Sequence, residues 1–161
     1  MFVAVGVAVK LYARHVLRTA CAVARVSGVI TPPAPAGHAG GAELVLAAMN
    51  FLDTRYRLGG NSAADGFDCS GFTRHVYATA LGVALPRRSV EQARQPGWHE
   101  VAPHQLQPGD LVFFHTLGSS YSHVGIYVGN GKMVAANNGG VEVVDIFGPY
   151  WGDHFTGYGR M

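Results

Sequence analysis

Cys69 stands in the run FDCSGF, between Asp68 and Ser70. A cysteine in such a setting can act as a nucleophile, a metal ligand, half of a disulfide or a small buried hydrophobe. The chain has two cysteines, Cys21 and Cys69, without a CxxC pair or a Cys/His cluster at zinc spacing. We therefore expect no metal and no cofactor. We also expect two free thiols in preference to a disulfide between these two residues.

The surroundings of Cys69 favour nucleophilic chemistry. The polar run before Gly66 is typical of a loop, and the apolar spacing after it predicts a helix over residues 69–81 that ends at Gly82. The thiol would then lie at a helix N-terminus, where the dipole favours the thiolate and a depressed pKa. Burial as a small hydrophobe is the alternative, and position alone does not decide between the two.

A cysteine nucleophile needs a base from another part of the chain, and eight histidines are candidates. His123 opens a predicted strand directly after the polar run LGSSYS, and His115 ends the strand before it. His75 follows Cys69 by six residues in the predicted helix, so its side chain points elsewhere. At the start of its strand, His123 would be held on rigid backbone and still be exposed to a cleft. This favours His123 modestly over His115.

Helices come first in the pattern and strands follow. Helices are predicted over residues 42–56, over residues 69–81 and briefly after Pro86. QPGD is a turn before the strand LVFFH, and NG joins the strands HVGIYVG and KMVAAN as a hairpin. GGVEVVDI and HFTGYGRM follow as two further strands. The order predicts an α+β fold in which N-terminal helices pack on an antiparallel β-meander.

Composition limits the function classes. The chain has 161 residues, 48% hydrophobic and 14% charged, with a net charge of +2. These values fit one globular domain, and the scattered basic residues predict no nucleic-acid partner. Residues 1–41 form an Ala/Val-rich segment and a Pro/Gly linker before a domain over residues 42–161. The segment is too short in apolar runs to span a membrane, and it is a poor signal peptide, an amphipathic helix or a wrongly assigned start.

Four runs in the same order resemble the NlpC-type bacterial cell-wall endopeptidases. They are YRLGGNSAADGFDCSGF, LPRRSVEQ, QPGDLVFF and SHVGIYVGNGKMV. The resemblance implies a papain-like cysteine peptidase that hydrolyses the peptide stems of peptidoglycan, typically next to γ-linked D-glutamate. It implies that Cys69 is the nucleophile and His123 the base.

The resemblance also implies substrate-binding residues. Tyr56, in the Tyr-x-x-Gly-Gly motif, would line the site near the thiolate and help bind the substrate or the oxyanion. Asp68 and Ser70 would contact the free amine end of the stem peptide. Arg87 and Ser89, in the Leu-Pro-Arg stretch, would lie near the cleft. Two simpler readings stay open, namely helix capping by Asp68 and core packing by Tyr56.

The sequence departs from the family pattern at one catalytic position. The family usually has a third polar residue, most often histidine, on the strand after GNGK, and this position holds Ala135. Alanine cannot accept a hydrogen bond from an imidazole. Asn137 has the right chemistry for the third catalytic residue, but two residues shift a side chain by about 6.6 Å along a strand. Asn137, a backbone carbonyl or water would then complete the site.

Three functions follow from these observations. The first is a cysteine endopeptidase that acts on peptidoglycan stem peptides, in the periplasm or secreted to the cell envelope. The second is a weakly active or inactive stem-peptide binding or scaffold protein of the same fold, which Ala135 favours. The third is a papain-like amidase or acyltransferase with another substrate. We expect a monomer, with room for a partner protein that targets or inhibits it.

Overall fold

The structure, a computed structural model, describes residues 40–116 and 118–161. The predictions for Cys21, for the N-terminal segment and for nearly all of the linker lie outside the described residues. The described elements are helices and an antiparallel sheet, which confirms the α+β class. Within the described residues, no helix has both the length and the apolar character to cross a membrane.

The helix that carries Cys69 has the predicted limits. Helix α3 runs over Cys69–Leu81. Its first turn is capped by Asp68, whose Oδ1 accepts a hydrogen bond from the backbone N–H of Gly71 at 2.7 Å. It ends at Gly82, whose φ of 69° is the left-handed conformation that glycine adopts without strain. Local sequence therefore places the thiol in the first turn.

The helix predicted over residues 42–56 is too long. Helix α2 covers only Gly41–Met49, and a series of turns follows it. Asp53 has a φ of 67°, and its N–H donates to the carbonyl of Val141 at 2.9 Å. The N–H of Val141 in turn donates to the carbonyl of Thr54 at 2.8 Å. Residues 53 and 54 thus form hydrogen bonds with a distant strand and do not continue the helix that the apolar spacing predicts.

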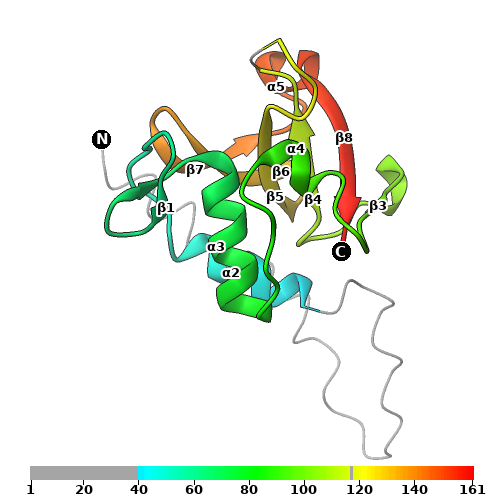
Figure 1. Ribbon diagram of the computed structural model, residues 1–161. Coiled ribbons are helices and arrows are strands. Elements are labelled where there is room, and N and C mark those ends of the chain that lie inside the picture. Colours follow the sequence, from blue (N-terminus) through cyan, green and yellow to red (C-terminus); the bar gives the residue numbers. More distant parts are fainter. Residues whose placement is uncertain (1–39, 117) are drawn as a thin grey trace, which may run out of the picture. The chain divides into compact units, whose positions relative to one another are not determined.

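The main sheet has six strands in the order β3-β8-β4-β5-β6-β7, and the neighbouring strands are antiparallel. Figure 1 shows its central strands beside α2 and α3. The bounds of its members are β3 His99–Glu100, β4 Leu111–Phe114, β5 His123–Gly129, β6 Lys132–Asn137, β7 Gly140–Asp145 and β8 Phe155–Arg160.

The fold also contains several short elements. A separate pair of two-residue strands, β1 Asn61–Ser62 and β2 Gly66–Phe67, precedes α3. The other short elements are helix α4 Ser89–Gln92, the 3₁₀ helix Pro103–Gln105 and helix α5 Pro149–Asp153. The sequence predicts α4 and none of the others. Elements this short lack the apolar periodicity that sequence patterns detect.

The predicted hairpin fixes the register around the site. Asn130 and Gly131 have positive φ values of 53° and 69°, as a turn of the hairpin type requires. Strands β5 and β6 then pair Tyr127 with Met133, after an irregularity that lies between Tyr127 and Gly129. This register brings Ala135 next to Gly125, where an added Cβ would lie 3.1 Å from that of Ala135.

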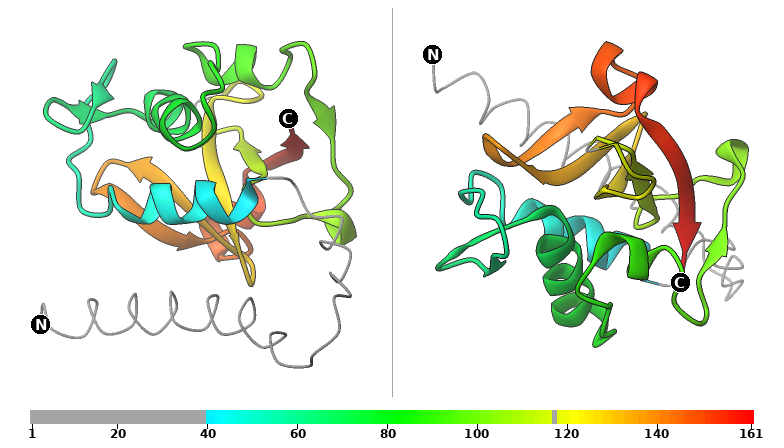
Figure 2. Two further views of the ribbon diagram at one scale, coloured as in Figure 1. Left: turned by 90° about the horizontal axis from the view of Figure 1, so that it is seen from below. Right: turned by 45° about the horizontal axis from the view of Figure 1, so that its top comes forward.

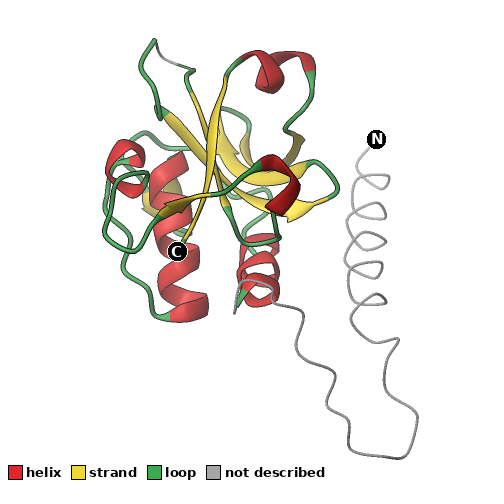
Figure 3. Cartoon of the chain, turned by 90° about the vertical axis from the view of Figure 1, so that its right-hand side faces the viewer, coloured by secondary structure: helices red, strands yellow, loops and turns green. Residues whose placement is uncertain are grey.

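The two faces of the sheet are covered differently. Helices α2 and α3 lie side by side against one side of the sheet in Figures 1 and 2, and both contact β5. Figure 3 shows the strands as one twisted sheet beside these helices. The opposite face carries a second buried cluster, made of Val101, Val112, Phe114, Met133, Ala135, Ile146 and Tyr158. His123 pairs with Phe114 across β4 and β5, so it projects on this second face.

Candidate active site

Cys69 lies where two pockets meet. Both pockets are lined by Cys69, Tyr56 and Ser122. The backbone N–H of Val124, at the start of β5, faces the sulfur of Cys69. Helix α3 and strand β5 therefore bring the thiol next to the segment that carries His123.

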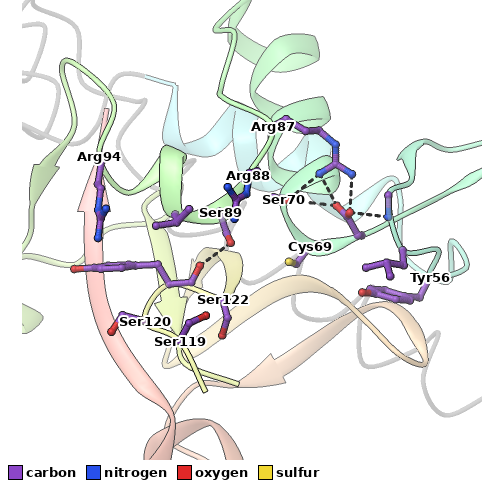
Figure 4. Close-up of a pocket in the computed structure, with 15 residues that line it drawn as sticks. Tyr56, Cys69, Ser70, Arg87, Arg88, Ser89, Arg94, Ser119, Ser120 and Ser122 are labelled. Atoms are coloured by element: carbon purple, nitrogen blue, oxygen red, sulfur yellow. Dashed lines mark hydrogen bonds and ion pairs between the residues drawn. The ribbon is translucent and has the colours of Figure 1, made fainter. Parts of the chain in front are cut away.

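The first pocket, here called the arginine pocket, has a volume of about 870 Å³. Figure 4 shows Cys69 with its sulfur toward this pocket, Tyr56 and Arg94 at its opposite ends, and Arg88 between them. Its lining residues are Tyr56, Leu58, Gly59, Asp68, Cys69, Ser70, Arg87, Arg88, Ser89, Val90, Arg94 and residues 119–122. It is thus rich in guanidinium and hydroxyl groups.

The second pocket, here called the histidine pocket, has a volume of about 360 Å³. It is lined by Tyr56, Cys69, Thr116, Ser122, His123, Ala136, Asn137, Asn138, Gly139, Glu142, Tyr150 and Trp151. His123 and Cys69 share this pocket, whereas His115 lines neither of the two. The fold therefore places His123, the histidine that the sequence favours, beside the thiol.

The imidazole of His123 is packed among apolar groups. It is 8% exposed, and its ring centroid lies 4.9 Å from that of Trp151 at an interplanar angle of 31°. Phe114 contacts it at a centroid distance of 6.2 Å. Burial lowers the pKa of His123 to about 4, because a charged imidazolium would be poorly solvated there. His123 is thus neutral near pH 7.

One nitrogen of this imidazole has no partner. Nε2 of His123 is buried and makes no hydrogen bond to any described residue. Ala135, which occupies the third catalytic position of the family pattern, is fully buried and has no polar side-chain atom. A buried nitrogen without a partner loses the hydrogen bond that would fix its tautomer and orientation. An incomplete site is one of the outcomes that Ala135 leaves open, beside completion by Asn137, a backbone carbonyl or water.

The proposed bond between Asn137 and His123 is not formed. Asn137 lines the histidine pocket, but its Nδ2 donates to Oε1 of Glu142 at 2.9 Å. Glu142 pairs with Ala135 across β6 and β7, so its side chain lies on the same face as that of Asn137. The amide nitrogen of Asn137 is thus bound to the neighbouring strand. The assignment of Asn137 as the third catalytic residue stays a prediction.

Asp68 makes several contacts within the protein. Its Oδ1 caps α3, and its Oδ2 accepts from the backbone N–H of Gly59 at 2.9 Å. Arg87 binds both carboxylate oxygens, at 3.0 Å and 2.6 Å, and also donates to Oγ of Ser70 at 2.9 Å. The arginine already balances the charge of Asp68, which favours the capping role. Binding of a substrate amine by Asp68 and Ser70 stays a prediction.

Tyr56 and Ser89 line the arginine pocket as the resemblance implies. Figure 4 shows the hydroxyl of Tyr56 on the side toward Cys69. Burial and the nearby Cys69 and Asp68 raise the pKa of Tyr56, so the phenol stays protonated and can donate a hydrogen bond. Oγ of Ser89 donates to the carbonyl of Tyr121 at 2.6 Å, which ties α4 to the loop before β5.

Comparison with known proteins agrees with this geometry. Residues 53–160 match the NlpC/P60 family.

The chain belongs to the NlpC/P60 family.

It is 44% identical over 118 residues to "Probable endopeptidase p60" of Listeria monocytogenes, covering 73% of this chain and 23% of that protein. It is 38% identical over 116 residues to "Bifunctional muramidase/DL-endopeptidase CwlT" of Bacillus subtilis, covering 71% of this chain and 34% of that protein. A crystal structure of an NlpC/P60 family protein from Bacillus cereus has a TM-score of 0.67 and 33% identity, over 75% of this chain and 39% of that one.

In this member of the NlpC/P60 family the expected depression of the Cys69 pKa is absent. Burial raises the pKa of the thiol, and the negative charge of Asp68 acts in the same direction. The N–H groups of Val124 and Ser70 oppose this shift but are outweighed by burial. With His123 also uncharged, the resting pair is a neutral thiol and a neutral imidazole. The lowering of the thiol pKa expected from the helix dipole is smaller than the rise caused by burial.

We expect iodoacetamide to alkylate Cys69 more slowly at neutral pH than it alkylates the same cysteine in the urea-unfolded chain. A raised pKa leaves a smaller thiolate fraction at a given pH, and the thiolate is the reactive species. The rate in the folded protein should therefore keep rising at a pH where the unfolded reference has levelled off. Peptide mapping by mass spectrometry measures both rates at Cys69. Faster alkylation of the folded protein at about pH 6.5 would show instead that the pKa of Cys69 is depressed, as the helix start predicts.

Several site residues carried no interpretable signal in the sequence. Trp151 stacks on His123 from α5, and Glu142 enters the histidine pocket from β7. Arg88 and Arg94 line the arginine pocket on either side of α4. Arg88 lies within the run LPRRSVEQ and Arg94 just after it, whereas Trp151 and Glu142 come from segments outside the four motif runs. Only the assembled fold brings all four to the two pockets. The described residues contain no group of three potential metal ligands among His, Cys, Asp and Glu.

Proposed function

We propose that this chain is a cysteine endopeptidase that hydrolyses the peptide stems of bacterial peptidoglycan, next to γ-linked D-glutamate. The observation that carries the proposal is the meeting of two pockets at Cys69, with His123 lining one of them. A cysteine at a helix start beside a histidine is the arrangement that cysteine peptidases use. The family membership makes a peptidoglycan substrate the first choice.

The chemistry follows from these two side chains. His123 takes the proton of Cys69 as the sulfur attacks the amide carbonyl, and a tetrahedral oxyanion forms. The backbone N–H of Cys69 at the helix start and the phenol of Tyr56 are the donors proposed for this oxyanion. His123 then protonates the leaving amine as the C–N bond breaks. Water, deprotonated by the same imidazole, hydrolyses the thioester and releases the acid and the free thiol.

The position of His123 gives the substrate a direction. The group that protonates the leaving amine must lie beside it. His123 lines the histidine pocket and does not line the arginine pocket. The leaving half of the substrate therefore occupies the histidine pocket, and the acyl half occupies the arginine pocket.

The acyl half of this groove suits an anionic group. Arg87 is paired with Asp68, whereas Arg88 and Arg94 form no ion pair with any described residue. A γ-linked glutamate offers its α-carboxylate as a side group next to the scissile bond. Guanidinium groups bind carboxylates well, and the hydroxyls of the same pocket can add hydrogen bonds. These charges support a γ-D-glutamyl acyl donor.

Two relatives are named endopeptidases, one of them a DL-endopeptidase. The chain spans about a quarter of the first and a third of the second, so the activity of this chain rests on its own site. Peptidoglycan lies outside the cytoplasm, which implies an extracytoplasmic place of action. Periplasmic or secreted location, a monomeric state and a targeting or inhibitory partner stay predictions.

A second candidate is a stem-peptide binding protein without activity. The unpartnered Nε2 of His123 and the alanine at position 135 favour it. Such a protein would keep the two pockets and lose the turnover. The retained pair of Cys69 and His123 in one pocket favours the enzyme.

Incubation with purified peptidoglycan tests the proposal. We expect mass spectrometry to show new fragments that end in γ-D-glutamate, and the Cys69→Ala variant should produce none above background. Binding of stem peptides to both proteins without any fragment from the native protein would establish the binding candidate instead. Fragments cut at another bond would move the scissile position and contradict the assignment of γ-D-glutamate to the arginine pocket.

A further inference from the structure

The indole of Trp151 lies against the imidazole of His123. The two ring centroids are 4.9 Å apart and the ring planes differ by 31°, which is close to a parallel, offset stack. Nε2 of His123 is buried and makes no hydrogen bond to a described residue, so no polar partner fixes the plane of the ring through this atom. The flat indole therefore restricts how the imidazole can turn.

Trp151 is itself held in place by the fold. Phe114, which pairs with His123 across β4 and β5, contacts Trp151 edge-on at a centroid distance of 4.9 Å. Trp151 also packs against the second buried cluster, of which Phe114 is a member. The carbonyl of His154, at the C-terminal end of α5, accepts a hydrogen bond at 2.8 Å from the N–H of His115, the residue after Phe114. Helix α5 is thus tied to the end of β4, and the indole cannot turn away from His123 without losing these contacts.

The stack also acts on charge. The face of an indole carries negative charge density that attracts cations. His123 becomes an imidazolium when it takes the proton of Cys69, and it loses this charge when it protonates the leaving amine. Burial, which lowers the pKa of His123 to about 4, disfavours the charged form, and the side chain of Ala135 has no acceptor to offer it. Trp151 places an attractive surface where this charge develops.

We propose that Trp151 is a positioning residue for His123 and takes over part of the role of the polar third residue that Ala135 cannot fill. Its indole restricts the plane of the imidazole and stabilises the imidazolium that forms during attack. This rests on the proposed function, because the imidazolium arises in that reaction. The stack does not select which nitrogen carries the proton, so an acceptor introduced at position 135 would still raise turnover.

Two substitutions of Trp151 test the proposal by kinetics. Trp151→Phe keeps a flat aromatic face, and Trp151→Leu keeps an apolar side chain without one. With L-Ala-γ-D-Glu-L-Lys-D-Ala as the substrate, we expect the leucine variant to lose about tenfold in kcat and the phenylalanine variant no more than about threefold. KM should stay within about twofold in both, because attraction to the imidazolium acts in the transition state and not on the bound substrate.

The other tryptophan of the chain provides the matched control. Trp98 is also half-buried, and it contacts Phe113 and lines neither pocket. Trp98→Leu should therefore keep the native kcat. Thermal unfolding confirms that each variant is folded, and Trp151→Met replaces the leucine variant if that one does not fold. Equal losses of kcat in the phenylalanine and leucine variants, or a loss confined to KM, would overturn the proposal, as would a native kcat in Trp151→Leu.

Nuclear magnetic resonance separates this proposal from the catalytic one. It uses the Cys69→Ala variant, which has no turnover, and the Hε1 signal of His123 is assigned by its loss when His123 is replaced by alanine. We expect this signal to be sharp, to broaden through exchange between ring orientations when leucine replaces Trp151, and to stay sharp with phenylalanine. This pattern supports the positioning role even if the native protein cleaves no stem peptide. An equally sharp signal in the leucine variant would refute the role of Trp151 and leave the endopeptidase function standing.

Discussion

Replacing His123 by alanine is expected to reduce hydrolysis of a stem peptide to near background, a loss on the order of 10²–10⁴-fold for a positioned acid–base group. His123 shares the histidine pocket with Cys69 and is the only histidine that lines it among the described residues. Without it, the thiol loses its proton acceptor and the leaving amine its proton donor. Hydrolysis of L-Ala-γ-D-Glu-L-Lys-D-Ala, followed by chromatography, measures the effect.

His115→Ala is the matched control. The backbone N–H of His115 donates to the carbonyl of His154 at 2.8 Å, and its ring lies 5.4 Å from that of His154. These contacts hold the ring away from both pockets, so this variant should keep most of the activity. Circular dichroism and thermal unfolding confirm that each variant is folded. Equal losses in the two folded variants would show that His123 is wrongly assigned or that both histidines serve the site.

Introducing histidine at position 135 should raise turnover, by up to about 10²-fold. Nε2 of His123 is buried without a partner, and residue 135 is on the face of β6 that carries the second buried cluster. An acceptor at position 135 would bind the proton on Nε2, which leaves Nδ1 to take the proton of Cys69. It would also stabilise the imidazolium that forms during attack. Turnover of the same peptide, measured beside the native protein, gives the gain.

The gain in turnover depends on whether a histidine side chain fits at position 135. Gly125 beside position 135 has no side chain, but the space over it is already filled by Met133, whose Sδ lies 2.6 Å from where a Cβ on Gly125 would stand. A larger residue must therefore displace Met133, at a cost of about 1–3 kcal/mol in stability. Ala135→Leu adds similar volume without an acceptor, so it should destabilise the fold without raising turnover. A gain in the leucine variant would mean that repacking, and not hydrogen bonding, activates His123.

Asn137 provides the second comparison. Because its amide is bound to Glu142, Asn137→Ala should reduce the turnover of the native protein by no more than a few-fold. Abolished activity that Ala135→His then rescues would make Asn137 the working third catalytic residue. No change from either substitution would show that the imidazole is held by backbone or water.

The local sequence determined the elements that carry the chemistry. Asp68 and Gly82 delimit α3 through a side-chain cap and a left-handed glycine, both of which act within a few residues. The Asn130–Gly131 turn fixed the hairpin in the same way, and His123 opens its first strand as predicted. The alanine at position 135 likewise shows in the sequence alone that this position offers no side-chain acceptor to an imidazole.

The tertiary structure decided the electrostatics and the partners. The pKa of Cys69 is raised and not depressed, because burial outweighs what the helix start contributes to it. Pairing with Val141 ended α2 earlier than its periodicity predicts. Trp151 and Glu142 reached the histidine pocket from segments without a motif. Desolvation and contacts between distant segments depend on the whole packed chain, and a pattern of neighbouring residues cannot contain them.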